Sequence, residues 1–187
     1  YDVDTLFPNQ EIVVDGRNWY KEVKQTQLSF EQVKWLKETC EEIGIEFLAS
    51  SFDRERLEWL EELDAKRHKA GVRATVDRRL LEEMASTGKE VFVSLDKGKP
   101  LGFLLKGNIK YLYCVPQYPT PVEKFHLSRV DFNKFSGLSS HYPGIEPAMI
   151  AIAKGAKVIE VHFCLSRKKL YNPDITSSVE PDELKRL

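Results

Sequence analysis

Three absences narrow the class of protein before any motif is considered. Cysteine is scarce, and the spacing of Cys40, Cys114 and Cys164 matches neither a zinc site nor a disulfide framework. We therefore expect reduced core cysteines in a cytoplasmic protein. No apolar run reaches the roughly 20 residues that a transmembrane helix needs, so no membrane partner is expected. The 28 basic residues balance the 29 acidic ones, which argues against a nucleic-acid-binding surface.

The chain has enough apolar residues for one sizeable core. Of its 187 residues, 42% are hydrophobic, and a chain of this length favours a single domain over residues 1–187. Because the sequence opens at Tyr1 rather than at a methionine, we expect a further segment upstream.

Strand-like and helical patterns alternate along the chain after a stretch, residues 1–28, that we predict to be irregular. Ser29 and Gln32 form a capping box at the start of the first helix, and Gly44 ends it. Strict alternation favours a parallel sheet with both faces covered. Six strands fit either an open sheet or a (β/α)8 barrel with two βα units upstream. The predicted strands are Ile45–Ala49, Lys66–Gly71, Glu90–Ser94, Ile109–Cys114, Lys134–Leu138 and Lys157–Phe163, and the predicted helices start near Ser29, Asp53, Asp77, His126, Gly144 and Pro181.

Two histidines follow neighbouring strands of this pattern. His141 ends the run that begins at Phe135, and His162 lies near the end of the run that begins at Val158, with a helix between them. The carboxyl ends of parallel strands form the face where such folds carry out chemistry. Two imidazoles there can reach one divalent metal ion. The alternative is a pair of buried or helix-capping histidines without a ligand.

Five stretches in order carry a family signature. They are IGIEFLASSFD from Ile43, TGKEVFVS from Thr87, CVPQYPTP from Cys114, GLSSH from Gly137 and GAKVIEVHF from Gly155. Together they resemble the strand motifs of the sialic acid synthases, which include pseudaminic and legionaminic acid synthases. With Asn172–Asp174 and the segment from Ser178 to Leu184, the resemblance covers nearly all of residues 28–184.

The resemblance implies a fold and a reaction. The fold is α/β, a (β/α)8 TIM-barrel type, with the third to eighth strands in this chain and the first two upstream. The family's C-terminal antifreeze-like domain is absent from this chain. The implied enzyme is a transferase that joins phosphoenolpyruvate to the aldehyde of an N-acylated amino sugar, giving a nine-carbon 2-keto acid and phosphate. A homodimer is an expectation from the resemblance alone.

The resemblance also assigns roles to residues. His141 and His162 match the ligands of a divalent metal, Mn²⁺ or Mg²⁺, and Glu160 lies on the same strand face as His162. With these two histidines, Glu160 completes the predicted catalytic set. The predicted substrate-binding residues are Lys69, Lys89, Ser94, Tyr118, Ser139 and Asp174.

Several positions depart from the family pattern. Two hydroxyl residues are replaced by Val115 and Pro116, and the usual Thr after the metal histidine is Tyr142. Lost donors weaken binding of a charged ligand by roughly 1–3 kcal/mol each. Two alternatives therefore stay open: another metal-dependent aldolase or lyase, and a barrel that has lost catalysis and serves as a binding module. The other departures are Val72, Asp96, Ser140 and Ile175.

Overall fold

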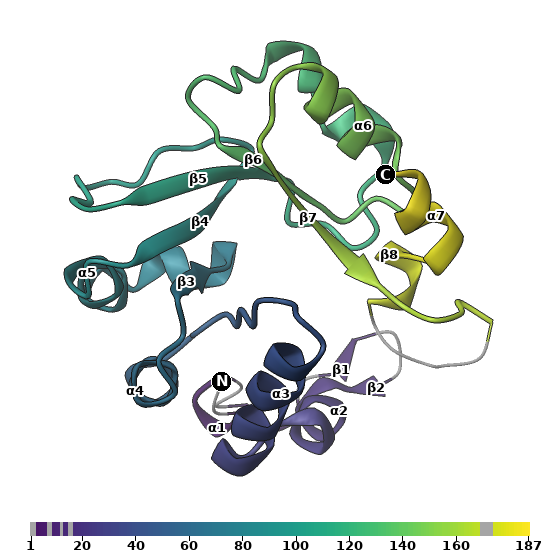
Figure 1. Ribbon diagram of the computed structural model, residues 1–187. Coiled ribbons are helices and arrows are strands. Elements are labelled where there is room, and N and C mark those ends of the chain that lie inside the picture. Colours follow the sequence, from purple (N-terminus) through teal and green to yellow (C-terminus); the bar gives the residue numbers. More distant parts are fainter. Residues whose placement is uncertain (1–2, 7–8, 12, 15–16, 169–173) are drawn as a thin grey trace. The chain divides into compact units, whose positions relative to one another are not determined.

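The computed structural model describes residues 3–6, 9–11, 13–14, 17–168 and 174–187. The chain forms two compact units, Tyr1–Val91 and Phe92–Leu187, which are described separately below. The main sheet has six strands in strictly sequential order, β3 to β8 (Figure 1). This is the α/β arrangement that the alternating pattern predicts, and it is of the (β/α)8 barrel type that the family resemblance implies. The strands are β3 (Arg67–Ala70), β4 (Glu90–Asp96), β5 (Ile109–Cys114), β6 (Gly137–Ser140), β7 (Val158–Phe163) and β8 (Ser178–Val179).

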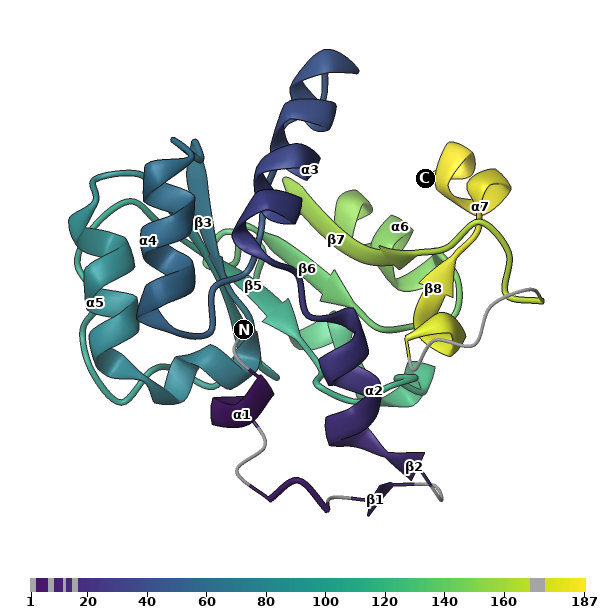
Figure 2. The same cartoon turned by 90° about the horizontal axis from the view of Figure 1, so that it is seen from below.

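The first unit is mainly helical. Its predicted helix starts are confirmed by side-chain caps: Ser29 and Gln32 form the capping box, while Asp53 and Asp77 each accept a backbone N–H three residues on. Helices α4 (Arg54–Glu62) and α5 (Arg78–Ser86) lie side by side (Figure 2). A 2.9 Å ion pair between Arg54 and Glu83 joins them. The helices are α1 (Val3–Leu6), α2 (Trp19–Thr26), α3 (Phe30–Glu42), α4 (Arg54–Glu62) and α5 (Arg78–Ser86), with a 3-10 turn η1 at Val72–Val76.

The prediction of an irregular stretch over residues 1–28 is wrong. Besides α1 and α2, this stretch contains the two-stranded antiparallel sheet of β1 (Val13–Val14) and β2 (Arg17–Asn18). The side chain of Asn18 accepts the backbone N–H of Lys21 and so caps α2. Asn is a favoured N-cap residue, so Asn18 could have indicated this helix from the sequence. The aromatic pair that begins the helix, Trp19 and Tyr20, is less typical of a helix.

The predicted strand Ile45–Ala49 is also wrong. The segment forms no strand. The side chain of Glu46 contacts β3 through a 2.6 Å ion pair with Arg67, but backbone pairing is limited to an isolated parallel bridge between the adjoining Ser50 and Lys69. The backbone N–H of Ser51 donates to the carbonyl of Lys69 at 3.2 Å, and pairing stops there. A strand requires a ladder of such bonds, which this apolar run lacks although its composition suits a strand.

The second unit contains four consecutive parallel strands, β5 to β8. Strand β6 begins at Gly137 rather than at the predicted Lys134, because the backbone N–H groups of Lys134 and Phe135 are committed to a turn at Asp131. The predicted 126–134 helix is reduced to a 3-10 turn. Strand β8 is two residues long and was not predicted. The remaining elements are η2 (Val122–Lys124), η3 (Leu127–Arg129), α6 (Glu146–Ala153), η4 (Ile175–Ser177) and α7 (Pro181–Arg186).

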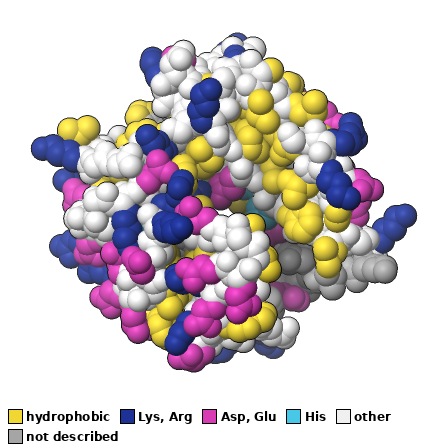
Figure 3. Space-filling view, viewed as in Figure 1, with side chains coloured by type: hydrophobic (Ala, Val, Ile, Leu, Met, Phe, Trp, Pro, Cys, Tyr) yellow, Lys and Arg dark blue, Asp and Glu magenta, His cyan; other side chains and the backbone are white. Residues whose placement is uncertain are grey.

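A buried cluster supports the strands that carry the two histidines. Strands β5 and β6 supply Tyr113 and Leu138, and α6 supplies Ala151. The Tyr113 hydroxyl donates to the carbonyl of Phe125 at 2.7 Å, so its buried polar atom is satisfied. Hydrophobic side chains also reach the surface over α6 (Figure 3). The exposed apolar residues of α6 are Met149, Ile150 and Ile152.

None of the helices in the described part of the chain is long and apolar enough to cross a membrane.

Candidate functional site

The register of the second unit brings polar side chains into rows. Ser139 on β6 lies opposite Cys114 on β5 and Glu160 on β7. Partners in parallel strands project to the same side of the sheet, and residues two apart on one strand share a face. His141, which directly follows β6, and His162 on β7 therefore lie one row beyond Ser139 and Glu160, toward the carboxyl ends of the strands.

The two imidazoles are close neighbours. Their ring centroids lie 5.3 Å apart with an interplanar angle of 49°. His141 is only 5% exposed, whereas the side chain of His162 is 32% exposed. The pair therefore combines one buried and one solvent-reachable ring.

A backbone carbonyl fixes the tautomer of His141. Its Nδ1 lies 2.8 Å from the carbonyl oxygen of Val115. A carbonyl can only accept, so Nδ1 carries the proton and donates it. In the neutral ring the lone pair then resides on Nε2, where a metal ion or a substrate proton can be bound.

Burial keeps His141 neutral. Removal from water lowers the pKa of His141 below its ordinary value of 6.5, and the neighbouring His162 lowers it further. The bond to Val115 and the charges of Glu160 and Asp174 act in the opposite direction without reversing the shift. A neutral imidazole at pH 7 is the form that a metal ion requires.

Two further predicted residues adjoin the histidine pair. The ring of Tyr118 lies over His141 at a centroid distance of 3.9 Å and meets His162 edge-on at 5.7 Å. Asp174 places Oδ2 3.8 Å from Nδ1 of His162, an ion-pair distance longer than a hydrogen bond. Asn172 and Pro173, which the family motif pairs with Asp174, lie outside the described residues.

The remaining predicted residues of this unit are buried in its sheet. Ser94 on β4 and Ser139 on β6 are both nearly inaccessible, and Glu160 is partly buried. Thus Ser139, Glu160, Tyr118 and Asp174 join the histidines either through strand register or through direct contact.

The donor set fits a divalent metal with two protein ligands. Two imidazoles bound through nitrogens about 2.1 Å from one ion have ring centroids roughly 4.5–5.5 Å apart, and the observed spacing falls within that range. The neutral state and fixed tautomer of His141 also fit. Among the described residues, no group of three or more His, Cys, Asp or Glu side chains is arranged to hold a metal. A metal here would keep its other positions open to water and substrate.

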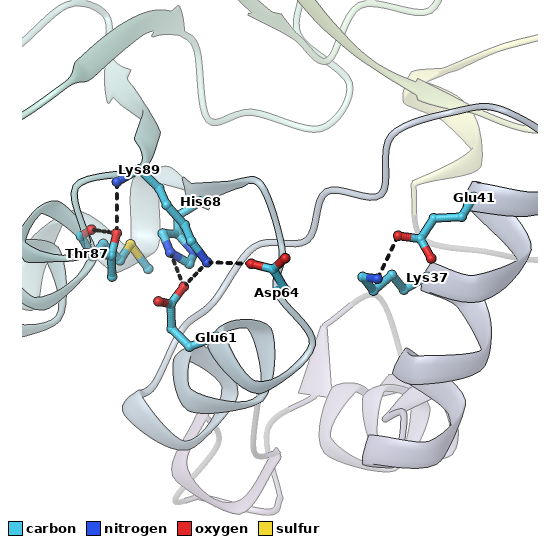
Figure 4. Close-up of polar contacts among 8 residues, drawn as sticks. Lys37, Glu41, Glu61, Asp64, His68, Thr87 and Lys89 are labelled. Carbon is cyan, nitrogen blue, oxygen red and sulfur yellow. Dashed lines mark hydrogen bonds and ion pairs between the residues drawn. The ribbon is translucent and has the colours of Figure 1, made fainter.

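The two predicted lysines belong to the first unit. Lys69 is buried on β3, where its Nζ donates to the carbonyl of Ala70 at 3.2 Å. Lys89 directly precedes β4, at the amino end of that strand, and its Nζ lies 2.8 Å from Oε1 of Glu61 (Figure 4). The same carboxylate oxygen lies 2.9 Å from Nε2 of the fully buried His68. Lys89 is thus part of a charged cluster at the amino end of β4, whereas Ser94 lies toward its carboxyl end.

Three of the departures from the family pattern have visible structural roles. Tyr142 turns into the hydrophobic cluster, where its ring packs edge-on against Phe125 at 6.2 Å. The carboxylate of Asp96 pairs with Lys99 at 3.2 Å. Val115 contributes its carbonyl to His141. This role was missed from the sequence, because every residue type carries a carbonyl.

Comparison with known proteins gives a consistent result. The model of the NeuB family matches residues 6–187. The N,N'-diacetyllegionaminic acid synthase of Legionella pneumophila is 32% identical over 90% of this chain and 52% of its own length. The human N-acetylneuraminate-9-phosphate synthase is 31% identical over 92% of this chain and 52% of its own. The chain thus spans about half the length of these curated relatives.

A solved structure agrees with these sequence relatives. The N-acetylneuraminic acid synthetase of Leptospira borgpetersenii, crystallised with citrate, superposes with a TM-score of 0.87 at 27% identity. The match covers all of this chain and 67% of that one.

Proposed function

This chain belongs to the NeuB family, and we propose that it acts as a synthase of sialic-acid-like sugars. In the proposed reaction, phosphoenolpyruvate condenses with the aldehyde of an N-acylated amino sugar. The enol carbon of phosphoenolpyruvate attacks the aldehyde carbon, and a carbon–carbon bond forms. The aldehyde oxygen takes up a proton, water adds to the former enol carbon, and phosphate leaves. The product is a nine-carbon 2-keto sugar acid.

One observation carries the proposal: two imidazoles lie 5.3 Å apart at the carboxyl ends of adjacent parallel strands. The hydrogen bond from Nδ1 of His141 to Val115 leaves Nε2 available to a ligand. His141 and His162 would hold the divalent ion, Mn²⁺ or Mg²⁺, and when bound it polarises the aldehyde carbonyl as a Lewis acid.

The surrounding side chains have roles that follow from their chemistry. The hydroxyl groups of Ser94 and Ser139 would donate hydrogen bonds to the anionic groups of phosphoenolpyruvate. Tyr118 presents an aromatic ring next to both imidazoles, where the sugar would be accommodated. Glu160 and Asp174 supply negative charge near the histidines and would orient them.

The test is the heat of phosphoenolpyruvate binding to the full chain with and without Mn²⁺. We expect binding that depends on the metal and is lost in His141→Asn and in His162→Asn. The matched control is His126→Asn, because His126 lies outside the site and its positive φ of 48° is one that asparagine tolerates.

Two results would contradict the proposal. If folded, metal-loaded protein bound no phosphoenolpyruvate, the barrel would be a binding module or another metal-dependent lyase. If His141→Asn bound phosphoenolpyruvate as tightly as the unmodified chain, the histidine pair would not be the site.

A further inference from the structure

Thr120 closes a ring of hydrogen bonds around His141. Its backbone N–H donates to the carbonyl of His141 at 2.9 Å. Its hydroxyl lies 2.7 Å from the carbonyl of Gln117 and 3.2 Å from that of Val115. The Val115 carbonyl in turn accepts Nδ1–H of His141 at 2.8 Å. The ring therefore runs from the main chain of His141 through Thr120 and Val115 to the His141 side chain.

Thr120 is well placed to hold this arrangement. It is only 1% exposed, so water competes little for its bonds. The hydroxyl has one proton, which goes mainly to the nearer carbonyl of Gln117 and is shared with Val115. Both bonds hold the loop from Val115 to Thr120 in a fixed shape.

The same loop carries Tyr118. Half of the Tyr118 side chain is exposed, yet its ring lies 3.9 Å from the ring of His141. Ordering a side chain costs conformational entropy, and a backbone fixed on either side lowers that cost for Tyr118. Thr120 fixes the backbone after Tyr118 through its bond to the carbonyl of His141, and the backbone before Tyr118 through its bond to the carbonyl of Gln117.

We propose that Thr120 is a positioning residue that sets both the tautomer of His141 and the placement of Tyr118 over it. The hydroxyl group is the essential part, because it contacts both the Gln117 carbonyl next to Tyr118 and the Val115 carbonyl that accepts from His141. The relevance of this device to metal binding rests on the function proposed above. Its effect on the imidazole itself does not.

The test compares Thr120→Val, which keeps the shape and removes the hydroxyl, with Thr120→Ser, which keeps the hydroxyl. The matched control is Thr75→Val in the first unit, because the Thr75 hydroxyl also donates to a carbonyl three residues back at 2.7 Å. If Thr120→Val does not fold, Thr120→Ala takes its place. All variants are made in the full chain.

Two readouts are used. Long-range ¹H–¹⁵N spectra of the metal-free protein report the tautomer of His141, and titration with Mn²⁺ alone reports metal affinity. We expect a single Nδ1–H tautomer in the unmodified chain, in Thr120→Ser and in Thr75→Val, and a mixture in Thr120→Val. We expect Mn²⁺ affinity to fall at least about 10-fold in Thr120→Val alone, as is typical when the partner of a metal-binding histidine is disturbed.

The outcomes separate this inference from the proposed function. An unmodified chain that binds no Mn²⁺ would refute the metal site, and the tautomer spectra would still decide the role of Thr120. An unchanged tautomer in folded Thr120→Val would overturn the inference. So would a loss of Mn²⁺ affinity in Thr75→Val equal to that in Thr120→Val, because the effect would then follow general stability.

Discussion

Replacing Gly137 with alanine tests the register on which the histidine pair depends. Gly137 opens β6 and lies opposite Val158, the first residue of β7. A Cβ at this position would overlap the Val158 carbonyl oxygen and lie 2.6 Å from its carbonyl carbon, whereas ordinary contacts begin at 3.4 Å. The obstacle is backbone, so no side chain can swing away. The contact with the carbonyl carbon alone falls about 0.8 Å short of 3.4 Å, and the closer carbonyl oxygen would require the two strands to separate further.

The cost of that separation can be bounded. Overpacking in a close-packed region costs about 1–3 kcal/mol. Each ladder hydrogen bond lost between β6 and β7 adds about 1 kcal/mol. We therefore expect the free energy of unfolding of Gly137→Ala to fall by about 3 kcal/mol or more. For a chain of this size, 3 kcal/mol corresponds to a Tm lower by roughly 6–12 °C.

The assay is urea and thermal unfolding followed by circular dichroism. Gly102→Ala is the control, because a Cβ there meets nothing within 4 Å and its φ is not positive. We expect Gly102→Ala to change stability by less than about 0.5 kcal/mol. If Gly137→Ala were as stable as Gly102→Ala, the close approach of β6 and β7, and with it the spacing of the histidines, would be wrong.

Three further predictions concern charged groups. Lys89→Met should lower the unfolding free energy by no more than about 1 kcal/mol, because the ion pair with Glu61 is partly exposed, and should leave phosphoenolpyruvate affinity unchanged by calorimetry. Burial lowers the pKa of His68 below 6.5, so the unfolded state binds more protons below that pH. Stability should therefore be full above pH 6.5 and decline as the pH falls through the folded pKa, and urea midpoints should show a weaker decline in His68→Gln. Arg167→Met should cost about 1 kcal/mol in urea unfolding, since it removes a 2.7 Å bond to Glu183.

Local signals in the sequence predicted much of the fold. Helix starts at Ser29, Asp53 and Asp77 depend on a side chain and a backbone N–H three residues apart, so a short window contains all that decides them. Strand pairing depends on a distant partner. The run Ile45–Ala49 has the composition of a strand, but only its neighbour Ser50 finds a pairing position, opposite Lys69. Composition cannot supply that information.

The candidate site was likewise predicted only in part from the sequence. The proximity of His141 and His162 follows from two adjacent strands and a shared face, which periodicity predicts. The direction of a long flexible side chain does not follow: the resemblance assigns Lys89 to substrate binding, and nothing in the sequence indicates that its Nζ pairs with Glu61 at the amino end of β4. The acceptor that orients His141 is a backbone carbonyl, which has no residue-specific signal.

This backbone dependence explains how the site can tolerate its altered lining. Val115 stands where the family pattern has a hydroxyl residue, yet the carbonyl that binds Nδ1 of His141 is retained by any side chain. Tyr142 replaces the usual Thr, but its ring packs against the hydrophobic cluster. What orients His141 is a carbonyl, the register of β6 and β7, and the hydroxyl of Thr120. The hydroxyl residues of the lining can therefore change while the geometry of the histidine pair is kept. Under the proposed function, changes in the acceptor sugar should then be separable from changes in metal binding.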